Sequence, residues 1–446
     1  MQQNTTFKSY LSKIILIVAL FVFLPIIFSP LATTTTSSYI ASCVCFLIIT
    51  LVVVKLMLRE NWFVRFYAFA FIIQTLLGLA HYLYFVDLHY FQGNGGGSSA
   101  FWHEYLSVFG AIDRLQDARN NFGVLYVMGS EDFQVTHYEI WHIISYPFYF
   151  LQHKWLNYEP FNIFASLSTS CNIMLLYKNF YRVDKSTSKT ILYWTAFFPS
   201  FLLADTVWRD AFGIYLISIG ITLASLSDSN IAKVFSFVVF CFGSFIQRTM
   251  YIILACVSIF WGNIIRTRTI VLKLLYFILG VVALYYVGNI AQDANEDGYS
   301  NSYVNNMSLF ALPIKIIFGM IGPFPWTNFF DGVRENPASA WDIKGYVMGT
   351  FQLGYLFAIF IKWKLLSFKR LDTLTIMGFG MMLSGFLTKQ LHMGYISQGL
   401  LFTLPWFFSQ IGPDYKVYVK YSLTILVMLN ILLLSLGHLN ISALWR

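Results

Sequence analysis

The sequence predicts an all-α polytopic membrane protein with about 13 transmembrane helices, additional interfacial or re-entrant helices, and two large outer loops. Of the 446 residues, 57% are hydrophobic and only 11% are charged, whereas about a quarter of a soluble domain is charged. Apolar stretches long enough to cross a bilayer recur from one end of the chain to the other. Lysine and arginine concentrate in alternate connections between these stretches. We therefore expect one polytopic domain over residues 1–446.

Each spanning helix requires about 20 mostly apolar residues. The stretches that meet this requirement are 14–32, 38–58, 62–86, 158–178, 189–207, 210–228, 231–247, 249–265, 270–290, 345–362, 372–389, 394–411 and 420–438. The first follows Lys8 and Lys13 as a signal peptide would, but no small-residue cleavage site comes after it, so we interpret it as an anchor. The run 138–155 is shorter and contains Pro147, which favours an interfacial or re-entrant segment.

The basic residues predict the orientation, because lysine and arginine collect on the cytoplasmic side of a membrane. The clusters are Lys8/Lys13, Lys55/Arg59/Arg65, Lys178/Arg182/Lys185/Lys189, Lys233, Arg266/Arg268/Lys273, Lys362/Lys364/Lys369/Arg370 and Lys416/Lys420. A topology with about 13 spans places all of these clusters on the cytoplasmic side. The long loops 87–137 and 291–344 then face outward. The outer face also receives a set of polar residues, namely His103, Glu104, Arg209, Asp210, Arg248, Arg334, Asp342, Lys389 and His392.

Composition also argues against two other classes of site. The net charge of +8 is spread between apolar runs and forms no nucleic-acid motif, so the bilayer, not a nucleic acid, is the expected partner. The cysteines all lie inside apolar segments and have no histidine or cysteine at metal-ligand spacing. They are Cys43, Cys45, Cys171, Cys241 and Cys256. We interpret them as small buried hydrophobes and predict neither a disulfide framework nor a metal site.

Two arginines stand where apolar runs meet. Arg209 in "ADTVWRDAFGIYL" has two interpretations. In the first, it snorkels to the headgroups or pairs with Asp210. In the second, the Asp210 carboxylate interacts with the start of a helix, where the dipole favours an anion, and the Arg209 guanidinium is available to another partner. Arg248 lies in "FCFGSFIQRTMYIILACV", an apolar stretch too long for one span, so it marks a tight outer turn or is embedded in the bundle. An unpaired arginine at depth costs several kcal/mol and is usually functional.

Histidines supply the other candidates for acid–base chemistry. Lys389 and His392 stand in "LTKQLHMGYISQG" at another outer turn, and His103 and Glu104 stand on an amphipathic stretch, "FWHEYLSVFGAIDRL", expected to lie on the membrane. A histidine can act as an acid or a base because its pKa lies near neutral pH. The alternatives are a structural histidine at 392 and a solvated polar face around residue 103.

The segment "GMIGPFPWTNFFDGVREN", residues 319–336, interrupts the apolar pattern with a proline-stiffened aromatic loop. Trp326 suits the membrane interface, and Arg334 and Asp342 follow on the same outer loop as candidates for substrate contact. The plainer interpretation is a stiff aromatic turn.

Together these residues predict an outward-facing cavity with several fixed positive charges and a few candidate bases. Guanidinium groups match phosphate oxygens through paired hydrogen bonds, so a lipid-linked pyrophosphate near the bilayer surface is the natural guest. Since the sequence has no evident metal-ligand cluster, the arginines would stabilise the leaving phosphate without a divalent ion.

Several short segments resemble one family, the Wzy-type polymerases that join lipid-linked oligosaccharide repeat units of O-antigen, capsule or exopolysaccharide. "FFPSFLLADTVWRDAFGIYL" looks like the family's Pro-Ser, basic-Asp-Ala and apolar-helix segment. "FIQRTMYIILA" resembles an "RPH-apolar" segment, and "GPFPWTN" resembles an "RPFPWE" loop. "HMGYISQGLLFTLPWF" is similar to a segment preceding a helix that ends in Leu-Pro, with Ser397 and Gln398 where the family has arginine. The resemblance covers roughly residues 80–410 by pattern and order.

The resemblance implies a glycosyl transfer with no cofactor at the periplasmic face of a bacterial inner membrane. Donor and acceptor would both be oligosaccharides linked to undecaprenyl pyrophosphate, and a chain-length regulator protein is a further candidate partner. Arg209 and Arg248 would bind the departing pyrophosphate, and Arg334 would clamp the donor. Asp210, His103 and His392 remain equal candidates for the general base, and Glu104, Lys389, Trp326 and Asp342 are expected to contact substrate.

Three alternatives stay open. An O-antigen ligase shares the chemistry. A GT-C glycosyltransferase that uses a polyprenyl-phosphate sugar usually carries an acidic motif in its first outer loop, where this chain has "ATTTTSS". A flippase or transporter usually places ionisable residues at mid-membrane depth, and few are evident in this sequence.

Overall fold

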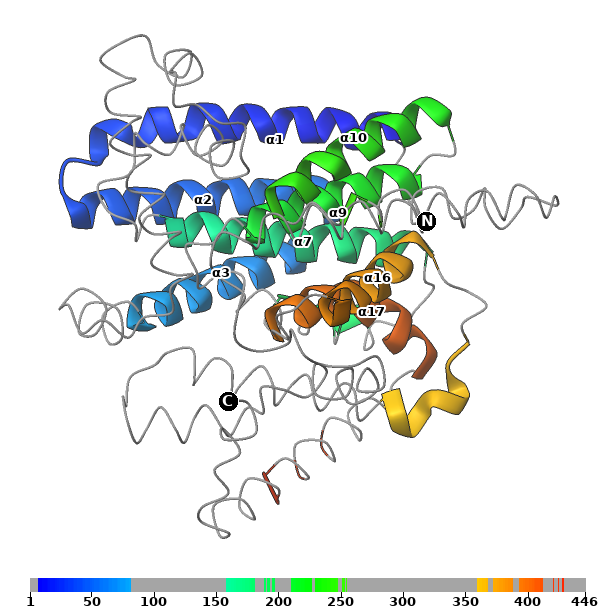
Figure 1. Ribbon diagram of the computed structural model, residues 1–446. Coiled ribbons are helices and arrows are strands. Elements are labelled where there is room, and N and C mark those ends of the chain that lie inside the picture. Colours follow the sequence, from blue (N-terminus) through cyan, green and yellow to red (C-terminus); the bar gives the residue numbers. More distant parts are fainter. Residues whose placement is uncertain are drawn as a thin grey trace, which may run out of the picture. The chain divides into compact units, whose positions relative to one another are not determined.

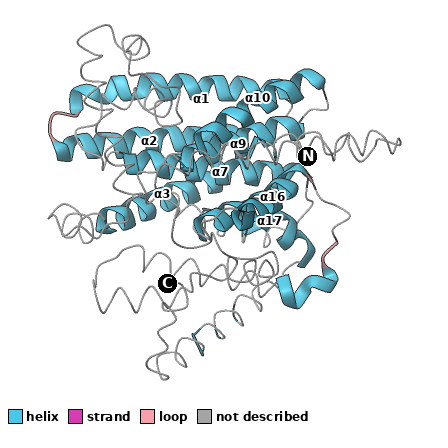
Figure 2. Cartoon of the chain, viewed as in Figure 1, coloured by secondary structure: helices cyan, strands magenta, loops and turns pink. Residues whose placement is uncertain are grey.

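The structure is a computed structural model, and it describes only part of the chain. The described residues are 7–81, 158–180, 210–226, 229–247, 359–367, 372–387 and 393–411, with isolated residues at 188–196, 251–254 and 420–428. Within these residues every regular element is a helix and no strand occurs (Figure 2). The all-α prediction is therefore confirmed for the described part of the chain.

Two compact units divide the chain, the first formed by Met1–Phe180 and Leu203–Thr249, the second by Tyr181–Leu202 and Met250–Arg446. The described helices of the first unit are α1 Phe7–Phe28, α2 Thr35–Leu58, α3 Asn61–His81, α7 Tyr158–Phe180, α9 Asp210–Leu226 and α10 Asn230–Gln247, with the 3-10 turn η1 at Ser29–Leu31 (Figure 1). Those of the second unit are α16 Thr373–Leu387 and α17 Met393–Ile411, with η6 at Trp363–Leu365.

These eight α-helices fall on eight of the stretches expected to span. Their ends differ from the expected ones by up to seven residues, the largest difference being the start of α1 at Phe7. Within the described residues two helices are long and apolar enough to cross a membrane, Phe7–Leu31 and Thr36–Leu58. Most of the other expected spans, the segment 138–155 and both long loops lie outside the described residues. The figure of about 13 spans thus stays a prediction.

Helix α7 is the centre of the first unit. Nearly every side chain between Pro160 and Tyr177 is buried, because α2, α3 and α9 pack around it. Its interior side chains include a run of small polar residues: Asn162, Ser166, Ser168, Thr169, Ser170 and Asn172. A helix buried on all sides needs no polar face, and its small side chains let neighbouring backbones come close.

Aromatic rings join α1, α2 and α9 to α7. Phe161 of α7 lies 5.4 Å from Phe212 of α9 and 5.6 Å from Phe46 of α2, measured between ring centroids. Phe21 of α1 stacks on Phe212 at 6.0 Å. Such ring pairs contribute about 0.5–1.5 kcal/mol each beyond the area that they bury. The aromatic cluster therefore fixes α1, α2 and α9 against the same stretch of α7.

Three hydrogen bonds between buried side chains cross the same interior. The Tyr10 hydroxyl of α1 donates to Asn172 Oδ1 at 2.9 Å, and Asn172 Nδ2 donates to Ser218 Oγ of α9 at 2.9 Å. Tyr67 of α3 and Ser170 share a further hydrogen bond of 2.9 Å. Each of these hydrogen bonds joins buried groups on two different helices, which offsets the cost of removing the groups from water.

The outward faces of α1 and α10 are strongly apolar. Ile15, Phe23 and Ile27 of α1 are each more than 60% exposed, and Ile231 of α10 is 80% exposed. Soluble monomers rarely expose contiguous apolar surface of this kind. These faces suit a lipid environment, which would solvate them at no cost.

The described lysines and arginines of the first unit gather at one end of its helix bundle. This basic end is formed by Lys8, Lys13, Lys55, Arg59, Arg65, Lys178 and Lys233. The end of α2 meets the end of α7 there, because Lys178 of α7 pairs with Glu60, which follows α2. The opposite end holds the starts of α7 and α9 and the ends of α1, α3 and α10. The described basic residues of the first unit, which the sequence predicts to share one side of a membrane, thus lie at one end of this unit.

In the second unit, α16 and α17 form a closely packed pair. A Cβ on Gly378 would lie 2.7 Å from the Gly399 carbonyl oxygen, and one on Gly399 would lie 2.5 Å from the Gly378 carbonyl oxygen. No side chain fits at either position without a backbone shift. Helix α17 continues through Pro405 to Ile411.

Candidate functional site

The α9–α10 hairpin positions the site that the sequence predicts. A Cβ on Gly243 of α10 would lie 2.8 Å from Leu216 Cβ and 2.9 Å from the Gly213 carbonyl oxygen. A Cβ on Gly220 of α9 would lie 2.9 Å from Phe240 Cβ. Glycine at these positions therefore allows the two backbones to touch at both ends of the contact, as in other small-residue helix pairs.

The register of this hairpin places the first residue of α9 beside the last turn of α10. Only residues 227–229 separate the two helices, so the helices are antiparallel, and Asp210 and Gln247 lie at the end remote from the turn. That is also the end opposite the basic end. Helix α9 begins at Asp210, as expected, where the positive end of the helix dipole favours a carboxylate.

Most of the predicted site residues lie outside the described residues. They are His103, Glu104, Arg209, Arg248, Trp326, Arg334, Asp342, Lys389 and His392. Of Asp210 the backbone is described and the side chain is not. In the chain, Arg209 directly precedes α9 and Arg248 directly follows α10, while Lys389 and His392 fall between the end of α16 and the start of α17.

One further residue of interest was missed as a candidate. Gln398 of α17 is 2% exposed, and its Oε1 accepts a hydrogen bond of 3.3 Å from the Tyr251 hydroxyl. Tyr251 comes three residues after Arg248 in the sequence, and Gln398 stands where the resembled family has arginine. The signal in the sequence was an amide within the apolar run of α17, and such a group needs a partner when buried.

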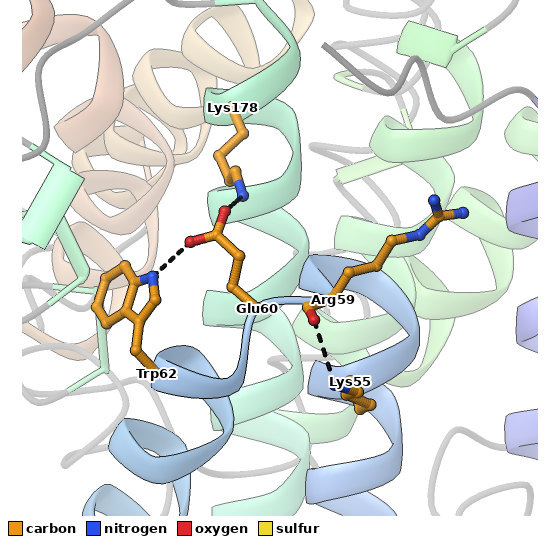
Figure 3. A network of polar contacts seen from close by, with 5 residues as sticks. All are labelled: Lys55, Arg59, Glu60, Trp62 and Lys178. Carbon is orange, nitrogen blue, oxygen red and sulfur yellow. Dashed lines mark hydrogen bonds and ion pairs between the residues drawn. The ribbon is translucent and has the colours of Figure 1, made fainter. Parts of the chain in front are cut away.

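A polar corner fixes the junction of α2 and α3 at the basic end. The Glu60 carboxylate pairs with Lys178 of α7 and accepts a hydrogen bond of 2.5 Å from the Trp62 indole nitrogen (Figure 3). The Lys55 ammonium donates to Asn61 Oδ1 at 2.6 Å and to the Arg59 carbonyl oxygen at 3.3 Å. The corner therefore ties two helices to the central α7.

The cysteines behave as small core residues where they are described. Cys45 and Cys171 are buried, Cys43 and Cys241 are half-buried, and these four are free thiols, while Cys256 lies outside the described residues. In the first unit, the described part of the candidate site consists of the ends of α9 and α10 and their close-packed glycines. In the second unit, it consists of the buried amide of Gln398. No protein-family model, curated protein or solved structure matches this chain.

Proposed function

We propose that this protein is a polytopic membrane glycosyltransferase that polymerises oligosaccharide repeat units carried on a polyprenyl pyrophosphate, as Wzy-type polymerases do. The observation that carries the proposal is the α9–α10 hairpin, which brings Asp210 and Gln247 to one end of the bundle. We propose that Arg209 and Arg248, which adjoin these residues in the chain, act together at that end. Paired guanidinium groups are suited to a pyrophosphate.

The proposed reaction joins two lipid-linked chains. A hydroxyl oxygen of the acceptor sugar attacks the anomeric carbon of the donor, and the bond from that carbon to the pyrophosphate oxygen breaks. The pyrophosphate leaves with the electron pair, and Arg209 and Arg248 offset its charge. Asp210, His103 or His392 takes the hydroxyl proton. The product is a longer chain on the acceptor lipid and a free polyprenyl pyrophosphate.

The second unit supports the same proposal through Gln398. Its hydrogen bond to Tyr251 ties the segment that follows Arg248 to α17. Lys389 and His392 stand in the connection before α17 in the chain, and we propose that they contribute to the same reaction. Arg334, Trp326, Asp342 and Glu104 complete the proposed substrate contacts from the two long loops.

Deletion of the gene tests the reaction class. In the source bacterium we expect surface glycan to lose its long-chain ladder on a gel while single-unit glycan remains. Loss of all surface glycan would instead indicate a flippase or an earlier transferase. A ladder that is still made but stays on its lipid carrier would indicate a ligase.

The variant Arg248→Ala tests the site. We expect the ladder to disappear while the amount of protein in the membrane stays unchanged, because the arginine acts on the leaving group and not on the fold. Arg65→Ala is the matched control, since it removes an exposed arginine from the basic end and should leave the ladder intact. A normal ladder in the Arg248→Ala strain would overturn the site assignment.

A further inference from the structure

A short segment of the second unit exposes apolar and basic side chains together. Residues 359–362 are helical, and η6 continues the chain to Leu365 (yellow in Figure 1). Its large exposed apolar side chains are those of Phe360, Ile361, Trp363 and Leu365. Phe360 is 73% exposed and Trp363 is 61% exposed. Its lysines are Lys362 and Lys364, of which Lys364 is exposed. We call residues 360–365 the exposed aromatic segment.

The two residues that follow attach this segment to α17. Leu366 is buried, and the Ser367 backbone N–H donates a hydrogen bond to Gln410 Oε1 in the last turn of α17. Gln410 Nε2 in turn donates to the Trp406 carbonyl oxygen at 3.3 Å, which holds the amide on its own helix. The exposed aromatic segment is therefore tied to the C-terminal end of α17, while its apolar side chains stay outside the packed helix pair.

This end of the α16–α17 pair is the one that the sequence predicts to face the cytoplasm. The two helices are antiparallel, so α16 begins where α17 ends at Ile411. Asp372 Oδ1 caps the start of α16 by accepting a hydrogen bond of 2.8 Å from the Thr375 backbone N–H. The sequence also predicts a span over 345–362, which ends within the exposed aromatic segment. The segment therefore stands where the chain is expected to leave the bilayer.

The mixture of side chains favours one environment. In the hydrocarbon core each lysine would cost about 2.5–3.5 kcal/mol, and in water a cluster of large apolar side chains is unfavourable. At the headgroup level both requirements are met, because tryptophan rings lie there and a lysine stem follows the acyl chains while its ammonium reaches the phosphates. A protein partner fits less well, since lysine is depleted from the buried centres of protein interfaces.

We propose that the exposed aromatic segment inserts into the headgroup region of the cytoplasmic leaflet and binds anionic phospholipid there. Phe360 and Trp363 lie at the boundary between headgroups and acyl chains, and the Lys364 ammonium contacts a lipid phosphate. The proposal rests on the membrane location that the proposed function includes, but it does not depend on the glycosyl transfer. The glycan ladder tests that reaction separately.

Fluorescence of the full chain in lipid nanodiscs tests the position of Trp363. The chain has 12 tryptophans, so the parent signal minus that of Trp363→Phe reports this residue. The nanodiscs contain phospholipid brominated either near the headgroup or near the ends of the acyl chains. We expect the shallow bromine to quench the difference signal more strongly than the deep one. Quenching by aqueous iodide alone would overturn the proposal, and protection from both quenchers would show that a protein surface covers Trp363 instead.

The same signal tests the preference for anionic lipid. In mixed nanodiscs the brominated component is phosphatidylglycerol or phosphatidylcholine, at the same fraction. We expect brominated phosphatidylglycerol to quench more strongly. Lys364→Gln should lower this preference about fivefold, the effect of one basic residue at an anionic surface, and Lys364→Arg is the matched control that should retain it. Equal quenching by the two lipids, or an unchanged preference in Lys364→Gln, would contradict the proposal.

Discussion

The two ends of the first unit are built by different means. At the basic end, the α2–α3 corner is fixed by exposed charges, and the side chains of Lys178 and Glu60 are 34% and 49% exposed. At the other end, the α9–α10 hairpin is fixed by backbone contact at Gly243, where no further atom fits. Solvent screens an exposed ion pair, whereas it does not weaken a steric contact.

The difference implies separate tasks for the two ends. Charges that are partly exposed contribute little stability. Close packing holds the ends of α9 and α10 at Asp210 and Gln247 together, as the proposed pyrophosphate site would require. The loss of stability on substitution should therefore be largest at the glycine contact, smaller at the buried hydrogen bonds, and smallest at the exposed ion pair.

Gly243→Leu should have the largest effect. The new side chain meets Leu216 and the Gly213 backbone, so α9 and α10 must separate, and overpacking of this kind costs about 1–3 kcal/mol or more. We expect a lower apparent Tm in detergent and a shortened glycan ladder. Val238→Leu is the control, because Val238 lies on the same helix and is 58% exposed. It should change neither the apparent Tm nor the glycan ladder. Equal Tm values for the two variants would show that the helix contact at Gly243 does not limit the size of the side chain at that position.

Asn172→Leu should have an intermediate effect. The substitution removes the acceptor of the Tyr10 hydroxyl and the donor to Ser218, and buried groups left in this way cost about 1–2 kcal/mol. Tyr10→Phe removes one of these hydrogen bonds and should cost less. Thermal unfolding of both variants in the same detergent measures the difference. A Tyr10→Phe variant less stable than Asn172→Leu would show that the tyrosine hydroxyl has a more important partner elsewhere.

Glu60→Gln should have the smallest effect. Its ion pair with Lys178 is partly exposed, so we expect a loss below about 1 kcal/mol that shrinks further as salt is added. The amide can still accept the hydrogen bond from Trp62. Apparent Tm at low and high salt provides the measurement. A large loss of Tm that added salt does not reduce would show that close packing, and not the exposed ion pair, stabilises this corner.

Apolar length and helix signals predicted the described helices well. Asp210 begins α9 and the span expected at 231–247 ends at Gln247, as α10 does. Basic clusters predicted which described helix ends of the first unit lie together, because Lys178 of α7 pairs with Glu60, which directly follows Arg59 after the end of α2. Both signals are local, since they depend on runs of residues and on the alternation of loops.

Contacts between distant residues could not be predicted in this way. Glu60 and Lys178 are 118 positions apart, and Tyr251 and Gln398 are 147 apart. Nothing in the local pattern shows which exposed charge or buried amide will face another. The left-handed backbone of Arg59 was equally hidden, because the sequence there has neither glycine nor asparagine to indicate it.

The enclosed position of α7 has a consequence for biosynthesis. Its six small polar residues are covered by α2, α3 and α9, and lipid cannot hydrogen-bond with them. Because α9 is made after α7, an α7 that spans the membrane, as the sequence predicts, would wait beside α2 and α3, or inside the insertion machinery, until α9 emerges from the ribosome. We therefore expect a chain truncated before residue 210 to leave α7 poorly inserted and to be degraded rapidly.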